Sequence, residues 1–254
     1  MALLEVKHLT KHFGGLTAVG DVTMELNEGE LVGLIGPNGA GKTTLFNLLT
    51  GVYEPSEGTI SLDGTLLNGK KPYTIASLGL SRTFQNIRLF KNMTVLDNVL
   101  LGMSNTNKSH FFSSLLRLPK FYASEETLRQ KAMDLLAIFG LDGKADHLAK
   151  NLPYGQQRRL EIVRALATEP KILFLDEPAA GMNPQETAEL TALIRQVKDQ
   201  FGITIILIEH DMSLVMEVTE RIYVLEYGRL IAHGTPDEIK NDKRVIEAYL
   251  GGDV

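Results

Sequence analysis

The sequence predicts an α/β protein: a core with a mainly parallel sheet, an N-terminal antiparallel β subdomain and an inserted helical subdomain. Short, continuous apolar runs at residues 31–35, 172–175 and 203–208 alternate with helix patterns, which is typical of parallel strands buried on both faces. Residues 4–9 instead alternate apolar and polar side chains, as half-buried antiparallel strands do. Helix start and stop signals dominate residues 85–165, so we expect a helical lobe there.

The composition fits one large domain and argues against several classes of protein. The chain has 254 residues, of which 44% are hydrophobic, enough to bury a full core as a single domain with a smaller lobe. Lys and Arg total 26 against 31 for Asp and Glu, so we expect no nucleic-acid partner. The absence of cysteine excludes disulfides, thiolate metal sites and thiol catalysis. The sequence shows no signal-peptide pattern and no apolar run near the roughly 20 residues of a membrane span, so membrane association would require a partner.

The N-terminal third combines the antiparallel patch with one strand–loop–helix unit. Residues 4–9 and 22–26 alternate as antiparallel strands, and 59–62 repeats this pattern after a Pro/Gly turn. The continuous apolar run 31–35 predicts a buried strand, and 44–49 predicts a helix with its leucines on one face.

The middle of the chain carries helix signals. Thr94 and Asp97 are spaced as a capping box, and residues 124–139 form an amphipathic stretch that Gly140 ends. Residues 104–114 are polar and without periodicity, so we expect a mobile or partner-dependent loop.

The last third returns to strands and helices in alternation. The expected strands are residues 172–175, 203–208, 221–225 and 230–233. Asn183, Pro184 and Glu186 together form an unusually complete helix start, and residues 235–238 start a short C-terminal helix.

Residues 36–43 read Gly-Pro-Asn-Gly-Ala-Gly-Lys-Thr and match the phosphate-loop pattern, which predicts a P-loop NTPase core. Its glycines let backbone N–H groups wrap a chain of phosphates, Lys42 would hold the β- and γ-phosphates, and the Thr43 hydroxyl would bind Mg²⁺. A Gly-rich turn with a stray lysine is the alternative; the preceding strand and following helix disfavour it. The candidate ATP-binding residues here are Gly36, Pro37, Asn38, Gly39, Ala40, Gly41, Lys42, Thr43 and Thr44.

Two acids follow the predicted strand 172–175. Ligands in such sheets lie at the carboxyl ends of the strands, so Asp176 is expected beside the phosphate loop, holding Mg²⁺ through water. Glu177, one residue further, is placed to orient or activate the attacking water. Two ordinary solvated turn acids are the alternative, which the upstream phosphate loop makes less plausible.

These motifs, in order and over nearly the whole chain, resemble those of the ATP-hydrolysing subunit of ABC transporters. By that resemblance, Gln85 in Arg-Thr-Phe-Gln is the glutamine that contacts Mg²⁺ and the water and links to the membrane partner. The stretch 152–159, Leu-Pro-Tyr-Gly-Gln-Gln-Arg-Arg, resembles the signature motif, whose role carries over to Gly155 and Gln156. It departs from the family pattern because Pro153 and Tyr154 replace the usual serine and glycine.

The same resemblance assigns three further positions. His210, after the predicted strand 203–208, matches the family's switch histidine, which holds the γ-phosphate and senses its loss. Phe13 is the aromatic residue expected against the adenine; a core or turn aromatic is the alternative. Asn183 stands where an aspartate is typical, which keeps the helix cap and removes a charge. The expected catalytic residues are therefore Glu177, His210 and Lys42, and the expected Mg²⁺ site comprises Thr43, Gln85 and Asp176.

The resemblance also implies an organisation. One ABC ATPase domain, 1–254, would contain an ATP-binding core (1–84 and 166–234), a helical lobe (85–165) and a C-terminal helical extension (235–254). It would work as a head-to-tail homodimer or paralogous heterodimer, peripheral on the cytoplasmic face of the membrane. Its other partners would be two permease subunits and, indirectly, an extracytoplasmic solute-binding protein.

Within the family, Arg-Thr-Phe-Gln-Asn around Gln85, the signature sequence and the inserted segment 104–123 resemble the ATPase of branched-chain amino acid importers. Ile87, Leu89 and Phe90 are then candidates for the groove that receives a cytoplasmic helix of the permease; packing within the lobe is the alternative. An ATPase of a lipid or drug exporter and a non-transport ABC ATPase that gates a membrane partner remain the rival functions.

Overall fold

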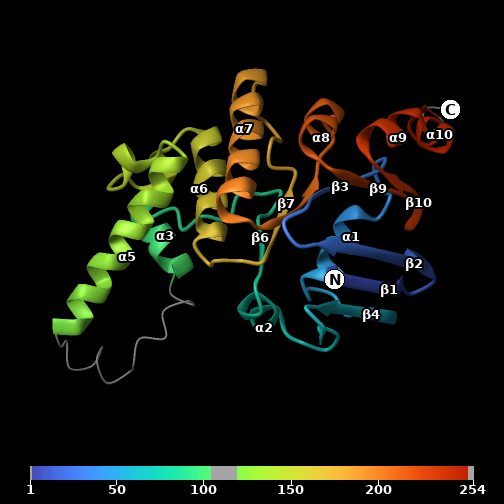
Figure 1. Cartoon of the computed structure of the whole chain (residues 1–254), viewed down its shortest axis with the longest axis horizontal. Coiled ribbons are helices and arrows are strands. Elements are labelled where there is room, and N and C mark those ends of the chain that lie inside the picture. Colours follow the sequence, from blue (N-terminus) through green and yellow to red (C-terminus); the bar gives the residue numbers. More distant parts are fainter. Residues whose placement is uncertain (1, 104–118, 251–254) are drawn as a thin grey trace. The chain divides into compact units, whose positions relative to one another are not determined.

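The computed structural model describes the backbone of residues 2–103 and 119–250, and the side chains of this part except those of 119–124 and 250. The chain divides into two compact units (Figure 1): unit 1 is Met1–Arg82 with Lys171–Val254, and unit 2 is Thr83–Pro170. The polar stretch 104–114 lies outside the described residues.

Unit 1 begins with a four-stranded antiparallel sheet of order β2-β1-β4-β5. Its strands are β1 (Ala2–Phe13), β2 (Leu16–Asn27), β4 (Glu57–Leu62) and β5 (Thr65–Leu66). The predicted strands at 4–9, 22–26 and 59–62 are confirmed, and the first two extend further because they form a hairpin that pairs Phe13 with Leu16. Gly14 lies in the turn at φ 59°, a conformation that glycine adopts without steric cost.

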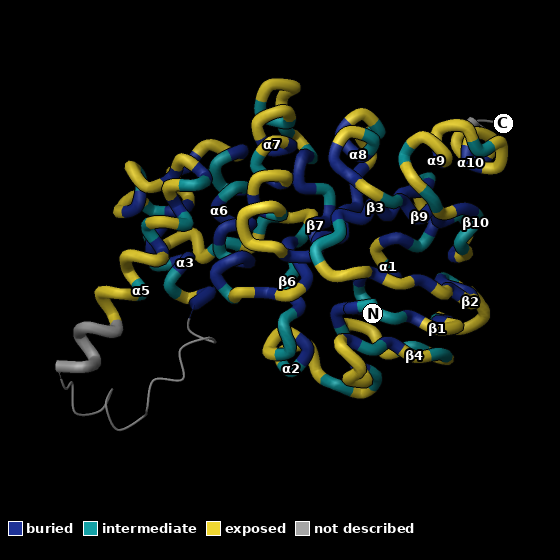
Figure 2. The backbone as a smooth tube through the Cα atoms, viewed as in Figure 1, coloured by how far each residue is buried: buried dark blue, intermediate teal, exposed yellow. Residues whose placement is uncertain are grey.

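A six-stranded sheet of order β10-β9-β3-β8-β7-β6 forms the centre of unit 1. Its strands are β3 (Leu31–Ile35), β6 (Leu80–Arg82), β7 (Ile172–Asp176), β8 (Thr204–Ile208), β9 (Arg221–Glu226) and β10 (Arg229–Gly234). All pairs are parallel except the β9–β10 hairpin. Every residue of β3, β7 and β8 is buried (Figure 2), as their continuous apolar runs predict. β6 is a three-residue strand that the sequence patterns missed.

The helices of unit 1 in the described residues are α1 (Lys42–Leu49), α2 (Pro72–Ser77), α7 (Pro184–Phe201), α8 (Met212–Val218), α9 (Pro236–Asn241) and α10 (Lys243–Leu250). Asn183 caps α7 by accepting from the Glu186 N–H at 3.0 Å, and the Glu186 carboxylate accepts from the Asn183 N–H at 3.1 Å. α9 begins where the short C-terminal helix was expected, and α10 lies within the expected C-terminal helical extension, while α2 and α8 were not expected from the sequence.

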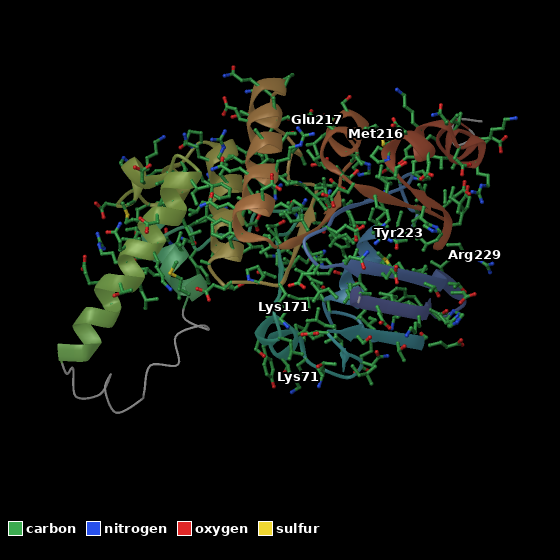
Figure 3. All side chains as sticks on the ribbon, viewed as in Figure 1. Lys71, Lys171, Met216, Glu217, Tyr223 and Arg229 are labelled. Carbon is green, nitrogen blue, oxygen red and sulfur yellow. The ribbon has the colours of Figure 1, made fainter. Side chains whose placement is uncertain are left out.

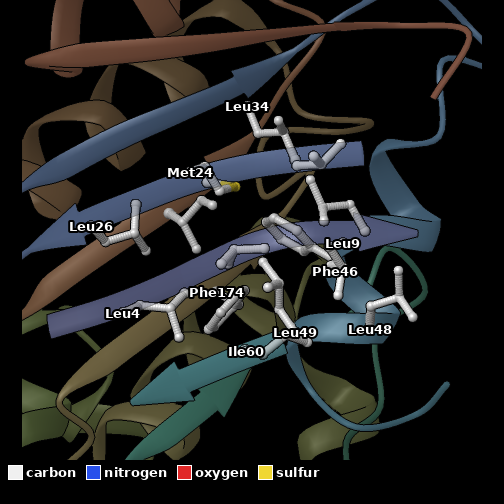
Figure 4. Packing of buried hydrophobic residues seen from close by; sticks show 14 of the residues in the cluster. Leu4, Leu9, Met24, Leu26, Leu34, Phe46, Leu48, Leu49, Ile60 and Phe174 are labelled. Carbon is white, nitrogen blue, oxygen red and sulfur yellow. The ribbon is translucent and has the colours of Figure 1, made fainter. Parts of the chain in front are cut away.

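Two apolar clusters cover the two faces of the central sheet. One joins it to the antiparallel sheet through α1 (Figure 4), where Phe46 and Phe174 meet edge to face with ring centroids 5.1 Å apart. The other joins Ile35 of β3 to α8, α9 and α10. Figure 3 labels two successive side chains of α8, Met216 and Glu217. Met216 packs against the second cluster, and Glu217 pairs with Arg195 at 3.1 Å. Leu34 and Ile35 therefore serve opposite faces, as alternation in a strand requires.

Unit 2 contains α3 (Val95–Met103), α5 (Pro119–Ile138) and α6 (Tyr154–Leu166), with short 3-10 turns at Asp142–Lys144 and Ala149–Asn151. At the start of α3 the Thr94 hydroxyl accepts from the Asp97 N–H at 3.0 Å, as the capping pattern predicts. α5 begins before the predicted residue 124, and Gly140 follows its end at φ 65°. Among the described helices of the chain, none has the length and apolar character needed to cross a membrane.

Candidate functional site

The phosphate loop connects β3 to α1 at the carboxyl end of the central parallel strands. Gly36, Gly39 and Gly41 have φ angles of 153°, 80° and 98°, which L-residues with a side chain rarely adopt. A Cβ at Gly36 would overlap the Leu225 backbone, and one at Gly41 would lie 2.6 Å from the Ala18 carbonyl oxygen. The glycines of this pattern are therefore required by the fold itself, as well as suited to phosphate approach.

Lys42 is buried at 6% exposure at the start of α1. Its ammonium donates to the carbonyl oxygens of Gly36 at 2.6 Å and Pro37 at 3.0 Å, so the loop holds the charged group at its own centre. Burial lowers the pKa of Lys42, and the negative charges of Glu177 and Asp176 oppose this shift. The predicted lysine and both predicted acids therefore share one electrostatic environment.

The other loop residues offer polar groups at the start of α1. Asn38, Gly39 and Thr43 are exposed, Pro37 and Thr44 are partly exposed, and Ala40 is buried. The first helical bond of α1 runs from the Leu45 N–H to the Gly41 carbonyl at 2.9 Å, so the N–H groups before it face away from the helix ladder. The N–H groups of the first helical turn and the helix dipole make this end of α1 suitable for an anion.

Asp176 ends β7 with its carboxylate buried beside Arg82, the last residue of the neighbouring strand β6. The Arg82 guanidinium donates to Asp176 Oδ2 at 2.7 Å and to Asn47 Oδ1 at 2.6 Å, and both charged side chains are at most 7% exposed. The pairing of Arg82 Nη2 with Asp176 orients the carboxylate at the strand end. The sequence analysis missed Arg82. The feature that could have identified it is a basic residue at the end of a short, partly apolar stretch.

Glu177 follows Asp176 in a left-handed backbone conformation, at φ 48°. Its N–H donates to the Ile208 carbonyl at 2.9 Å, and its Oε1 lies 2.9 Å from His210 Nε2. A non-glycine residue in this region carries a cost of about 1–3 kcal/mol, which is characteristic of functional sites. The structure thus brings the predicted catalytic Glu177 and the predicted switch His210 into direct contact.

A third carboxylate, that of the buried Glu209, helps to hold Glu177 and His210 in place. Its side chain accepts from the Ala179 N–H at 2.7 Å and from the His210 N–H at 3.1 Å. Burial raises the pKa of Glu209 against these hydrogen bonds. Glu209 therefore ties the chain after β7 to the chain after β8, which carry Glu177 and His210. The sequence analysis did not single it out.

The residues of unit 1 fit the chemistry of Mg²⁺. The Thr43 hydroxyl and the Asp176 carboxylate are hard oxygen ligands, which this ion prefers. Within the described part of the chain no cluster of three or more His, Asp or Glu side chains could hold a metal alone. Mg²⁺ commonly binds through one or two carboxylates together with substrate phosphates and water.

Phe13 lies at the end of β1 with 42% of its surface exposed. Its ring meets Tyr53 edge to face with centroids 5.3 Å apart, and the Lys11 ammonium is 5.2 Å from its centre. An exposed ring with a second aromatic and a cation beside it is a suitable surface for a flat base. Tyr53 is a partner that the sequence analysis missed.

Gln85, Gly155 and Gln156 belong to unit 2. Gly155 is buried in the first turn of α6, after the N-cap Pro153, which makes no side-chain cap bond. The Gln156 Oε1 accepts from Lys144 at 2.7 Å. Arg158, which the sequence analysis did not single out, donates to the Gln85 carbonyl at 2.7 Å, so α6 and the backbone at Gln85 are directly joined.

Known sequences and structures resemble this chain over most of its length. The sequence model of the family described as "ABC transporter" matches residues 19–180, and the model described as "Branched-chain amino acid ATP-binding cassette transporter" matches residues 229–254. The high-affinity branched-chain amino acid transport ATP-binding protein LivG of Salmonella typhimurium is 51% identical over 249 residues, covering 98% of each chain.

Solved ATP-binding cassettes have the same fold. The cassette of an ABC transporter in its ADP conformation has a TM-score of 0.85 at 33% identity, covering 99% of each chain. A dimeric cassette in a post-hydrolysis state, bound to ADP and phosphate, has a TM-score of 0.78 at 26% identity, covering 92% of this chain and 98% of that one. With a family model over residues 19–180 and a half-identical relative over nearly its full length, this chain belongs to the ATP-binding subunits of the ABC transporter family.

Proposed function

We propose that this chain is the ATP-hydrolysing subunit that energises an importer of branched-chain amino acids. The observation that carries the proposal is the contact of Glu177 with His210, beside the buried Lys42 that completes the phosphate loop. The substrate class is supported by the name of the 51% identical LivG and by the second family match at 229–254. The motifs alone would equally suit an exporter of lipid or drug, or an ABC ATPase that gates a membrane partner.

The candidate site residues of unit 1 then each have a role in hydrolysis. Backbone N–H groups of the phosphate loop and Lys42 hold the phosphates, and Phe13 stacks on the adenine. Mg²⁺, when bound through Thr43 and through a water on Asp176, would supply charge neutralisation of the phosphates. Glu177 orients the attacking water and accepts its proton, and His210, whose Nε2 lies 2.9 Å from Glu177 Oε1, would contact the γ-phosphate when ATP is bound. Catalysis is thus positioning and electrostatics.

The proposed site is completed by a second copy of the subunit or by a paralogue. Gly155 and Gln156 lie in the first turn of α6, a helix of 13 residues whose N-terminal N–H groups favour an anion. They would contact the γ-phosphate held by the other subunit, while Gln85 would contact Mg²⁺ and the water. The solved dimeric cassette with ADP and phosphate supports this organisation.

The proposed membrane partners are two permease subunits, with a solute-binding protein acting through them. The chain would lie peripherally on the cytoplasmic face of the membrane. Ile87, Leu89 and Phe90 are the proposed contact with a cytoplasmic permease helix; Phe90 is 52% exposed, and the Arg164 guanidinium lies 5.5 Å from its ring. In this proposal the ATP-binding core comprises 1–84 and 166–234. The helical lobe, 85–165, contacts the partners, and a helical extension follows at 235–254.

The catalytic assignment is tested by the substitution Glu177→Gln, which keeps the size and hydrogen bonding of the side chain but removes its basicity. We expect turnover to fall by at least about a hundredfold while ATP affinity stays within a few-fold, because the phosphates are held by other groups. Phosphate release and equilibrium ATP binding measure the two effects. Glu28→Gln, at an exposed position of unit 1, is the matched control. Normal hydrolysis by Glu177→Gln would rule out the assignment.

The transport assignment needs the assembled complex. Membranes that contain this subunit and its co-purified permeases should show ATPase activity stimulated by a leucine-loaded binding protein. Phe90→Asp should uncouple transport from hydrolysis, since it puts a charge in the proposed apolar contact with the permease. Stimulation by a different class of solute, with none by leucine, would contradict the substrate class and leave the ATPase assignment standing.

A further inference from the structure

Residues 84–90, here named the 84–90 segment, follow β6 without forming a helix or strand, and yet polar side chains hold their backbone at several points. The segment begins with Phe84 and Gln85 and ends at Phe90, so it contains both the proposed Mg²⁺-contacting glutamine and the proposed permease contact. All contacts considered below lie within unit 2.

Arg158 of α6 holds the start of the segment. One guanidinium nitrogen donates to the Phe84 carbonyl at 2.6 Å and the other to the Gln85 carbonyl at 2.7 Å. Arg158 is completely buried, and its rigid fork matches the two successive carbonyl oxygens. A charged side chain is thus placed in the interior of unit 2 to bind backbone.

Glu161 holds the middle of the segment from the next turn of α6. Its Oε1 accepts from the Arg88 N–H at 3.0 Å, and its Oε2 accepts from Arg158 at 3.2 Å. Glu161 is 1% exposed. Burial raises the pKa of Glu161, and the hydrogen bond from Arg88 and the charge of Arg158 oppose this shift. Arg158 therefore donates hydrogen bonds to the segment, and Glu161 accepts one from it.

Asn98 of α3 holds the end of the segment. Its Oδ1 accepts from the Phe90 N–H at 3.0 Å, and its Nδ2 donates to the Phe90 carbonyl at 3.2 Å. Asn98 is completely buried as well. Two helices of unit 2 therefore hold both ends of one short segment through buried polar groups.

We propose that Arg158, Glu161 and Asn98 are positioning residues that hold the backbone of the 84–90 segment in one conformation, so that it moves as one body with α6. The physical reason is that a buried ion pair is a poor source of stability compared with apolar side chains of the same size. Its hydrogen bonds, by contrast, specify one arrangement of the backbone they bind. A displacement of the segment by a permease would then reach Gly155 at the start of α6 directly.

This inference rests on the proposed function of Gln85 and α6, and it is tested by replacing the buried pair with methionine at both positions, Arg158→Met with Glu161→Met. The double substitution removes both charges of the pair together with its bonds to the segment, so neither Arg158 nor Glu161 is left buried without the other. We expect the melting temperature to stay within a few degrees and amide exchange at Arg88 to rise about tenfold, because its acceptor is gone. We expect kcat for MgATP to fall about tenfold with KM unchanged, since unit 1 holds the phosphates.

Glu126→Met with Arg129→Met is the matched control, because it removes the same two charges at the same spacing from the exposed surface of α5. Arg158→Lys is a second variant that keeps the charge beside Glu161, and hence the fold, but cannot bridge two carbonyls as a fork does. We expect it to raise exchange in the segment and lower kcat.

The outcomes separate the two proposals. A folded double variant with the exchange and kcat of the unaltered protein would overturn the positioning role, and so would full activity of Arg158→Lys. A loss of stability with unchanged exchange in the 84–90 segment would also overturn it. An unaltered protein that fails to hydrolyse MgATP would instead contradict the proposed function, and the exchange measurement, which needs no nucleotide, would still test the role of Arg158.

Discussion

Lys42 is an ammonium group that the phosphate loop buries and binds through its own carbonyl oxygens. Its pKa is lowered from the ordinary 10.5, chiefly by burial. Between the lowered pKa and 10.5 the unfolded chain binds more protons than the folded one, so the contribution of Lys42 to stability rises with pH in this window. Bound phosphates would raise the pKa of Lys42 again, because their negative charge favours the ammonium form.

Nucleotide binding should therefore take up a proton at alkaline pH. Just below pH 10.5, where burial leaves part of the Lys42 population deprotonated in the folded protein, we expect net proton uptake when MgATP binds. Calorimetric titrations in buffers of different ionisation enthalpy measure this number directly. Lys42→Arg, which stays charged, is the control and should show no uptake. Equal uptake by the arginine variant would show that another group is responsible.

The helix α7 owes its sharp start to the reciprocal hydrogen bonds of Asn183 and Glu186. This start fixes where the chain that follows Asp176 and Glu177 turns away from the site. The capping box is a local feature: each bond spans three residues, so the sequence is enough to predict it.

Asn183→Ala should lower the free energy of unfolding by about 1 kcal/mol, because the Glu186 N–H loses its acceptor. Urea denaturation followed by circular dichroism measures the change. Asn183→Asp keeps the acceptor and adds a negative charge at the helix N-terminus, so we expect stability equal to or slightly above that of the unaltered protein. Unchanged stability of the alanine variant would show that the cap contributes nothing.

In the proposed function, ATP hydrolysis requires two copies of the subunit, and each nucleotide is bound between them. Glu177→Gln with MgATP should form a dimer whose mass light scattering can measure, and MgADP should not support it. Adding Gly155→Asp should abolish the dimer by placing a negative charge against the γ-phosphate, while each monomer still binds ATP.

Gly143→Asp is the matched control for that experiment. It adds the same charge to unit 2 at an exposed glycine where a Cβ meets no atom within 4 Å. We expect the control to dimerise normally. A Glu177→Gln protein that stays monomeric with MgATP would contradict the shared site, whereas dimerisation despite Gly155→Asp would contradict the role of Gly155 alone.

The sequence by itself determined the features that depend on local chemistry and on periodicity. The continuous apolar runs specified β3, β7 and β8 because strands buried on both faces need no polar side. The glycines at 36, 39 and 41 could be recognised because the backbone they permit is closed to other residues. Asp176 and Glu177 followed from their position at the end of a buried strand, and His210 from the resemblance to the ATPases of ABC transporters.

The tertiary structure alone decided which residues from distant parts of the chain meet. Arg82 binds Asp176 across 94 positions of sequence, and Arg158 binds the Phe84 and Gln85 carbonyls across more than 70. A buried arginine leaves no periodic signal, because its place is set by partners that the fold delivers and not by its neighbours in the chain. Local propensity could therefore predict the phosphate loop, while the side chains that hold its acids and the 84–90 segment became visible only when the strands and helices were packed.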